Sequence, residues 1–156
     1  MAQSFTIFQN RSLEKKILGF INCPINKKIL CSKNSGVTEY LAKKNNIKNS
    51  EAMMIYNKNL SVVPVTTHIP VKNISKNIKA NIIEKKIITV NNFYKKFLNR
   101  KPKIAVLGLN PHNAEFSKNS VENKIIKPVI KKLKKNSYRI SGPFSSDTIF
   151  IKDKRQ

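Results

Sequence analysis

The sequence predicts an α/β protein with a largely parallel or mixed sheet. Residues 75–98 show apolar side chains at helical spacing, and residues 120–136 show a second amphipathic helical pattern. Between them, Ile104 to Leu109 are all apolar or glycine, which is typical of a strand buried on both faces. Helical patterns that alternate with buried strands indicate the α/β class. We expect residues 1–156 to form a single α/β segment.

The first third of the chain predicts short elements. Residues 13–18 read as the end of a helix that passes into a short strand over 19–22, which Pro24 stops. The stretch "GVTEYLAKKNNI", residues 36–47, predicts a short helix with a cap between Gly36 and Thr38.

Two β-rich runs follow, "AMMIYN" at 52–57 and "LSVVPVTT" at 60–67. The short polar connection between them is typical of adjacent strands joined by a tight turn. Pro64 lacks a backbone donor, so we expect the second run to be an edge strand or a bulged strand.

The longest helical pattern lies within residues 75–98. Its apolar positions are spaced by four, three, four and three residues and predict one continuous stripe: Ile83, Ile87, Val90, Tyr94 and Phe97. The helix at 120–136 opens on a weak Ser120 cap, and we expect Pro128 to bend it. "YRISGPFSSDTIF" then predicts a strand, a Gly-Pro turn and a capped segment.

Composition limits the classes of function. The 156 residues carry a formal net charge of +23, which would attract phosphate. However, only four of the 31 basic residues are arginine, and the lysines are scattered along the whole chain. Heavy joint use of Lys, Asn and Ile is typical of an AT-rich coding sequence, so we do not expect nucleic acid to be the partner.

No apolar run has the length of a signal peptide core or a membrane span, and Cys23 and Cys31 match no zinc or redox spacing. We therefore expect a cytoplasmic protein with reduced cysteines.

The two histidines are the candidate functional residues. His68 follows "SVVPVTT" and His112 follows "IAVLGLNP", so each lies beyond the carboxyl end of a predicted strand, where α/β proteins bind ligands. Two imidazoles at neighbouring strand ends could share a divalent metal, with Asp147 or Glu115 as a nearby carboxylate. Alternatively, each histidine caps a strand end and hydrogen-bonds a backbone carbonyl. Spacing alone leaves both interpretations open.

Several ordered motifs resemble one known family. "INCPINKK", "GVTEYLA", "VTTHIPV", "KIAVLGLNPHNAE" and "GPFSSDTIF" occur in this order, and together they resemble 4-hydroxythreonine-4-phosphate dehydrogenases over roughly residues 20–150. The resemblance implies a three-layer α/β/α sandwich like that of isocitrate and isopropylmalate dehydrogenases, here incomplete at both ends. It implies a homodimer whose sites lie at the subunit interface.

The resemblance also implies a reaction. The family oxidises the 3-hydroxyl of the phosphorylated hydroxy-amino acid 4-phosphooxy-L-threonine with NAD, and loss of CO2 then gives 3-amino-2-oxopropyl phosphate for pyridoxal phosphate synthesis. The implied cofactors are NAD and a divalent metal, Zn, Mg or Co, held by three histidines. A sister dehydrogenase acting on phosphorylated threonate shares these motifs. A non-catalytic remnant or basic binding protein is the alternative from another class.

The resemblance also implies roles for individual residues. His68 and His112 stand where the family has its first two metal ligands, Thr38 stands at a substrate-binding position, and Asp147 is a candidate catalytic residue. Val37 replaces a family histidine that contacts substrate, and Ala114 replaces a glycine. The third metal histidine and the NAD-binding residues are expected beyond Phe150, so we expect the 156-residue chain alone to be inactive.

Overall fold

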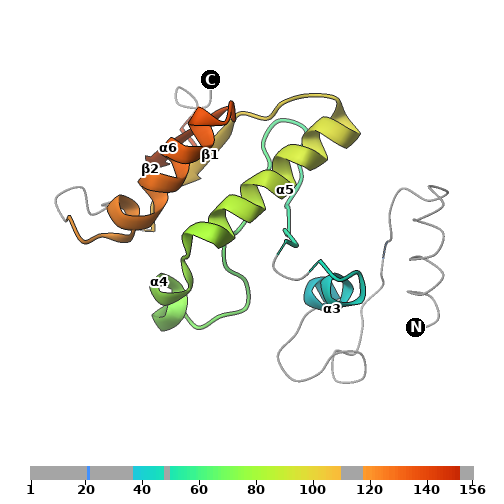
Figure 1. Cartoon of the computed structure of the whole chain (residues 1–156), viewed down its shortest axis with the longest axis horizontal. Coiled ribbons are helices and arrows are strands. Elements are labelled where there is room, and N and C mark those ends of the chain that lie inside the picture. The colour runs from blue at the N-terminus through green and yellow to red at the C-terminus, as the bar shows by residue number, and fades with distance from the viewer. Residues whose placement is uncertain (1–20, 22–36, 48–49, 110–117, 152–156) are drawn as a thin grey trace. The chain divides into compact units, whose positions relative to one another are not determined.

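A computed structural model describes residues 21, 37–47, 50–109 and 118–151 (Figure 1). The chain divides into two compact units, Met1–Glu51 and Ala52–Gln156. The helix predicted at 36–47 is confirmed as α3, Val37–Lys44, in the first unit. Glu39 in its first turn and two lysines in its last turn complement the helix dipole. The helix end and strand predicted over 13–22 lie outside the described residues, except for the exposed Ile21.

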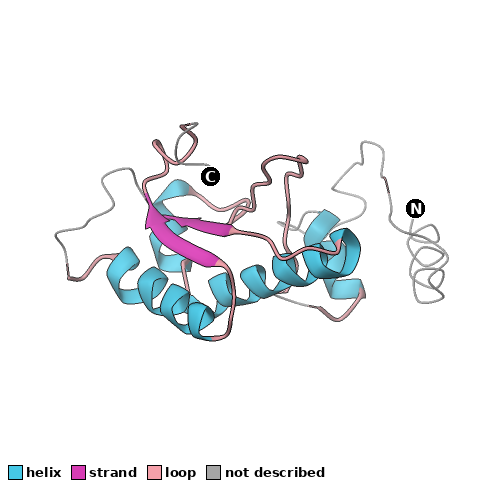
Figure 2. Cartoon of the chain, turned by 90° about the horizontal axis from the view of Figure 1, so that it is seen from above, coloured by secondary structure: helices cyan, strands magenta, loops and turns pink. Residues whose placement is uncertain are grey.

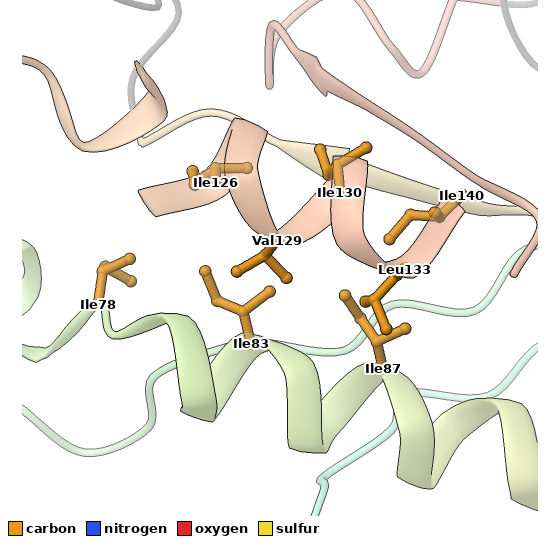
Figure 3. Packing of buried hydrophobic residues seen from close by; sticks show 8 residues of the cluster. All are labelled: Ile78, Ile83, Ile87, Ile126, Val129, Ile130, Leu133 and Ile140. Carbon is orange, nitrogen blue, oxygen red and sulfur yellow. The ribbon is translucent and has the colours of Figure 1, made fainter. Parts of the chain in front are cut away.

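The core of the second unit forms where two helices and a strand meet. Helix α5, Ala80–Leu98, packs beside α6, Lys127–Lys135, and strand β2, Ile140–Phe144, covers α6 (Figures 1 and 3). All the buried side chains of this cluster are aliphatic: Ile78, Ile83, Ile87, Ile126, Val129, Ile130, Leu133 and Ile140. Their burial accounts for much of the stabilisation, because each large aliphatic side chain contributes about 1.5–3 kcal/mol when fully buried.

The long helix begins later than its pattern predicts. The chain forms a 3-10 turn η1, Val71–Asn73, and a short helix α4, Ile74–Asn77. It then becomes extended at Ile78, whose side chain is buried in the core cluster. The single helix expected from Ser75 is therefore wrong at its start, because burial of Ile78 takes precedence over helix continuation.

The apolar stripe of α5 is only partly buried. Ile83, Ile87 and Tyr94 are buried as predicted, whereas Phe97 is 53% exposed. Phe97 contacts Phe93 of its own helix, with ring centroids 5.3 Å apart and ring planes tilted by 35°, and lies outside the core cluster. Asn91 is buried on the same helix.

The described sheet has two parallel strands, β1, Ile104–Leu107, and β2 (Figure 2). Their parallel pairing with helices packed alongside confirms the α/β class. The expected burial of β1 on both faces is wrong for the described residues, since Ala105 is exposed. Side chains alternate along a strand, so Ile104 and Val106 contact the core cluster while Ala105 faces the other way.

Strand β2 contains a one-residue irregularity at Gly142. Ala105 pairs with Ser141 and Leu107 pairs with Phe144, so β2 has one more residue than β1 in this interval. Gly142 has φ +124°, and a Cβ there would lie 2.3 Å from the carbonyl oxygen of Val106. Only glycine fits this close approach. The predicted Gly-Pro turn is therefore wrong, because Gly142 and Pro143 lie within the paired strand.

The two strands expected at 52–57 and 60–67 are reduced to one antiparallel bridge between Ile55 and Val62. Their antiparallel pairing is as expected, and the side chain of Asn57 accepts the backbone N–H of Asn59 in the connecting turn. Pro64 has no N–H to extend the ladder. Most apolar side chains of this hairpin are exposed and none is fully buried, so packing within the described part of the chain gives little support to longer strands.

The second amphipathic helix is confirmed and has two parts. It opens as a π-helical turn η2, Glu122–Ile126, and continues as α6. The weak cap at Ser120 is formed, because its Oγ accepts the N–H of Asn123 at 3.2 Å. Pro128 lies in the first turn of α6, directly after the π turn. Among the described residues, no helix is long and apolar enough to cross a membrane.

Candidate functional site

The carboxyl ends of β1 and β2 form one edge of the sheet. The last bond between the strands runs from the N–H of Gly108 to the carbonyl oxygen of Phe144, at 2.8 Å. Beyond this bond, β1 leads into Asn110, Pro111 and His112, and β2 leads into the segment that holds Asp147. Ligands of open α/β sheets bind at such an edge.

Asp147 lies in a turn directly after β2. Its carboxylate accepts a hydrogen bond from the hydroxyl of Ser145 at 2.5 Å, and the N–H of Ile149 donates to the carbonyl oxygen of Ser145. The side chain of Asp147 is exposed. The parallel pairing thus brings Asp147 to the edge at which β1 also ends.

His68 lies in an exposed loop before η1, with a positive φ of 55°. This backbone conformation is uncommon for any residue except glycine. Val65, three residues earlier, packs against the core cluster and anchors the loop. The strand expected at 60–67 is reduced to the isolated pairing of Val62 with Ile55, so in the described part of the chain His68 does not directly follow a regular strand.

His68 is exposed to solvent. No described residue donates to or accepts from its imidazole, so the backbone-capping interpretation has no counterpart among these residues. Neutral imidazole nitrogen is a good ligand for Zn or Co, and the donor type therefore fits the expected metal. Residues 21, 37–47, 50–109 and 118–151 contain no group of three or more His, Cys, Asp or Glu side chains placed to hold an ion.

Two predicted site residues, His112 and Glu115, lie outside the described residues. The pairing of His68 with His112 therefore stays a prediction. Thr38 lies in the first turn of α3, in the first unit. Its role in substrate binding also stays a prediction, as does the catalytic role of Asp147.

Sequence reasoning missed Glu122. This side chain is only 3% exposed, and its Oε1 accepts the backbone N–H of Leu109 at 2.9 Å. Two signals were present in the sequence: the chain has only eight acidic residues, and Glu122 lies four positions before Ile126 on the apolar face of a helix. A charged residue on such a face is rarely buried without a specific bond.

The sequence matches the family model described as pyridoxal phosphate biosynthetic protein PdxA over residues 2–156. The chain belongs to the PdxA family. Relatives in this family include the 4-hydroxythreonine-4-phosphate dehydrogenase of Sulfurihydrogenibium sp. (strain YO3AOP1), which is 39% identical over 143 residues. That alignment covers 88% of this chain and 44% of the relative. The enzyme of the same name from Aquifex aeolicus is 35% identical, over 90% of this chain and 45% of the relative.

Solved structures of PdxA proteins have the same fold. The 4-hydroxythreonine-4-phosphate dehydrogenase of Klebsiella pneumoniae superposes with a TM-score of 0.76 at 27% identity, over 92% of this chain and 45% of that one. The protein of the same name from Burkholderia phymatum gives a TM-score of 0.71 at 30% identity, over 85% of this chain and 41% of that one. The chain spans less than half the length of these relatives.

Proposed function

We propose that this chain contributes to the NAD-dependent oxidation and decarboxylation of 4-phosphooxy-L-threonine, which gives 3-amino-2-oxopropyl phosphate for pyridoxal phosphate synthesis. The observation that supports it most strongly is the PdxA family match over residues 2–156, together with relatives that carry the name 4-hydroxythreonine-4-phosphate dehydrogenase. We further propose that it works in the cytoplasm as part of a homodimer.

In this proposal His68 and His112 hold a divalent metal. The exposed imidazole of His68, free of hydrogen bonds to the other described residues, supports its assignment as a ligand. When bound, the metal would supply Lewis-acid polarisation of the substrate oxygen. His68 and His112 would bind and orient it.

The remaining roles belong to Thr38 and Asp147. The hydroxyl of Thr38 would hydrogen-bond the substrate. Asp147 would accept or donate a proton close to the reacting carbon, and its carboxylate is oriented by the hydroxyl of Ser145. Its place at the carboxyl edge of the sheet supports this role.

A chimera tests the proposed function. The matched region of the Sulfurihydrogenibium enzyme is replaced by this chain, so that the relative supplies the rest of the protein. We expect the chimera to reduce NAD with 4-phosphooxy-L-threonine and to release CO2. Because loss of one metal ligand removes both binding and orientation of the metal, His68→Ala and His112→Ala should each lower the rate by at least about 100-fold.

Lys72→Ala is the matched control, since Lys72 is exposed and lies four residues after His68. It should leave the rate unchanged. If the chimera prefers phosphorylated threonate as its substrate, the chain belongs instead to the sister dehydrogenase that acts on that compound. A folded chimera that reduces NAD with neither substrate would refute the dehydrogenase function and favour a non-catalytic role.

A further inference from the structure

The two strands of the described sheet begin at the edge opposite to the candidate site. Ile104 and Ile140, the first residues of β1 and β2, pair with each other, and the N–H of Ile104 donates to the carbonyl oxygen of Arg139 at 2.8 Å. Because α5 leads into β1 and α6 leads into β2, the chain enters this edge from the C-terminal ends of the two helices (Figure 1). The fold therefore brings together two stretches that are separate in the sequence, residues 95–103 and 134–139.

Both stretches are strongly basic. They read "KKFLNRKPK" and "KKNSYR", and every lysine and arginine in them is exposed. We call these lysines and arginines the basic edge. The end of α5 that carries part of it is well fixed, because the N–H groups of Asn99 and Arg100 both donate to the carbonyl oxygen of Tyr94.

The basic edge is not neutralised by acidic residues of the described part of the chain. The sequence has no Asp or Glu at 85–114 or at 123–146. Glu84 lies just before the first of these intervals, and its carboxylate is already paired with Lys132 of α6 at 2.7 Å. No residue of the basic edge forms an ion pair with another described residue.

Complementation of the helix dipoles accounts for only part of this charge. Lys95 and Lys96 lie in the last turn of α5, and Lys134 and Lys135 lie in the last turn of α6, where the dipole favours cations. The other basic residues follow the ends of the helices, in the connections to β1 and β2. Concentrated positive charge on one surface attracts an anionic partner.

An exposed aromatic ring lies within the basic edge. Phe97 is 53% exposed, and the ammonium of Lys96 lies 5.2 Å from the centroid of its ring. Proteins that bind single strands combine basic side chains for the phosphates with aromatic rings on which bases stack. A membrane surface would instead require several exposed apolar side chains, and Phe97 is the only large one in residues 95–103 and 134–139.

We propose that the basic edge binds single-stranded nucleic acid, with its lysines and arginines on the phosphates and Phe97 stacked on a base. The scattered lysines of the sequence argued against such a partner, but the fold gathers those of the two stretches at one edge. Contacts to phosphate carry no sequence information, so binding is independent of base sequence. Since this surface lies at the opposite end of the strands from the candidate site, the proposal does not depend on the proposed function.

Fluorescence anisotropy of a labelled oligouridylate, titrated with the purified 156-residue chain, tests the proposal. The oligonucleotide has about 16 nucleotides, enough for a typical single-strand site. The triple variant Lys95→Ala, Lys101→Ala and Lys135→Ala should raise Kd by at least about tenfold at about 0.1 M salt, because each bound phosphate contributes roughly fivefold at that concentration. The slope of log K against log salt concentration should fall by about 2.

A second triple variant is the matched control. Lys72→Ala, Lys76→Ala and Lys79→Ala remove the same charge from exposed positions that precede α5. Helix α5 has 19 residues, so about 28 Å separate its two ends. Because charges are screened over about 10 Å at this salt concentration, the control should keep Kd within about twofold of wild type.

The aromatic contact has its own test. Phe97→Ala should raise Kd for the oligouridylate by at least about fivefold without changing the salt dependence. Phe150→Ala removes a 39% exposed ring beyond β2 and should leave Kd unchanged. Circular dichroism spectra like that of wild type show that the variants are folded, and Phe97→Leu replaces Phe97→Ala if the alanine variant is not.

Four outcomes would overturn the proposal. The first is the absence of oligouridylate binding by wild type, and the second is equal weakening by the two triple variants, which would show that only the total charge matters. The third is unchanged affinity in the Phe97 variant, since the surface would then recognise phosphate alone. The fourth is binding to phosphatidylglycerol vesicles but not to the oligouridylate, which would identify a membrane surface.

Discussion

Helix α5 and the hairpin at residues 52–62 are both rich in apolar side chains, yet only the helix is packed. Ile83 and Ile87 of α5 are less than 8% exposed, whereas Ile55 in the hairpin is 63% exposed and Tyr56 is 50% exposed. The backbone N–H and C=O groups of a helix hydrogen-bond to each other within the helix, so a helix needs only an apolar surface against which one face can pack. A strand needs a hydrogen-bonded neighbour as well as a packed face. The hairpin has one bridge, and none of its residues at 52–62 is fully buried.

The largest effect should come from the packed region. Leu133 is 1% exposed, at the centre of the cluster formed by α5, α6 and β2. Leu133→Ala should lower the free energy of unfolding by about 2–5 kcal/mol, because it leaves a cavity. Urea denaturation measures the change. The same substitution at Leu60, which is 43% exposed in the hairpin, is the control, and equal losses at both positions would remove the contrast between the regions.

The next effect concerns the close approach of the two strands. Gly142→Ala should destabilise the chain by about 1–3 kcal/mol, because alanine is strained at φ +124° and its Cβ would meet the Val106 carbonyl. Thermal and urea unfolding measure the loss. Ser141→Ala changes an exposed neighbour in the same strand and should be nearly neutral. A Gly142→Ala variant as stable as wild type would contradict the described pairing of β1 with β2.

A side-chain hydrogen bond joins the hairpin to α5. The hydroxyl of Tyr94 donates to Oγ of Ser61 at 3.0 Å. Tyr94→Phe should cost about 0.5–1.5 kcal/mol, while its ring stays beneath the Arg100 guanidinium, 5.3 Å from the ring centroid. Urea denaturation of this variant, of Ser61→Ala and of the double variant gives the coupling energy. Additive single effects would show that the bond does not tie the two regions together.

The smallest effect should be in the hairpin itself. Ile55→Ser should change the free energy of unfolding by no more than about 0.5 kcal/mol, because the side chain is already in water. The same change at the buried Ile130 is the comparison and should be severe. A large loss from Ile55→Ser would mean that the hairpin is covered by apolar contacts.

Sequence periodicity predicted the elements that pack through one face. The helical stripe at Ile83 and Ile87 and the second helix with its Ser120 cap are both present. Periodicity failed where a distant contact decides the local structure. Burial of Ile78 delays the start of α5, and the approach of Val106 places Gly142 inside a strand.

The candidate site was predictable in part. The carboxyl edge of the sheet and the place of Asp147 after β2 followed from the strand patterns, because parallel strands end at one edge. Glu122 did not follow, because its partner is a backbone N–H thirteen residues away and no local pattern encodes that pairing. The motif "VTTHIPV" identified His68 as a candidate metal ligand. The sequence did not predict the positive φ of His68 in its loop, which Val65 anchors to the core cluster.

The π turn at Glu122–Ile126 changes the direction of side chains before it relative to those after it in the same helix. A π turn adds one residue to the α-helical ladder, and each residue of an α-helix turns by about 100°. The turn therefore rotates Glu122 relative to the buried face of Val129 and Leu133. Removal of one residue from this turn should therefore change the direction of the Glu122 carboxylate relative to Val129 and Leu133. The inserted residue thus allows the helix to pack Val129 and Leu133 into the core while the Glu122 carboxylate accepts the N–H of Leu109.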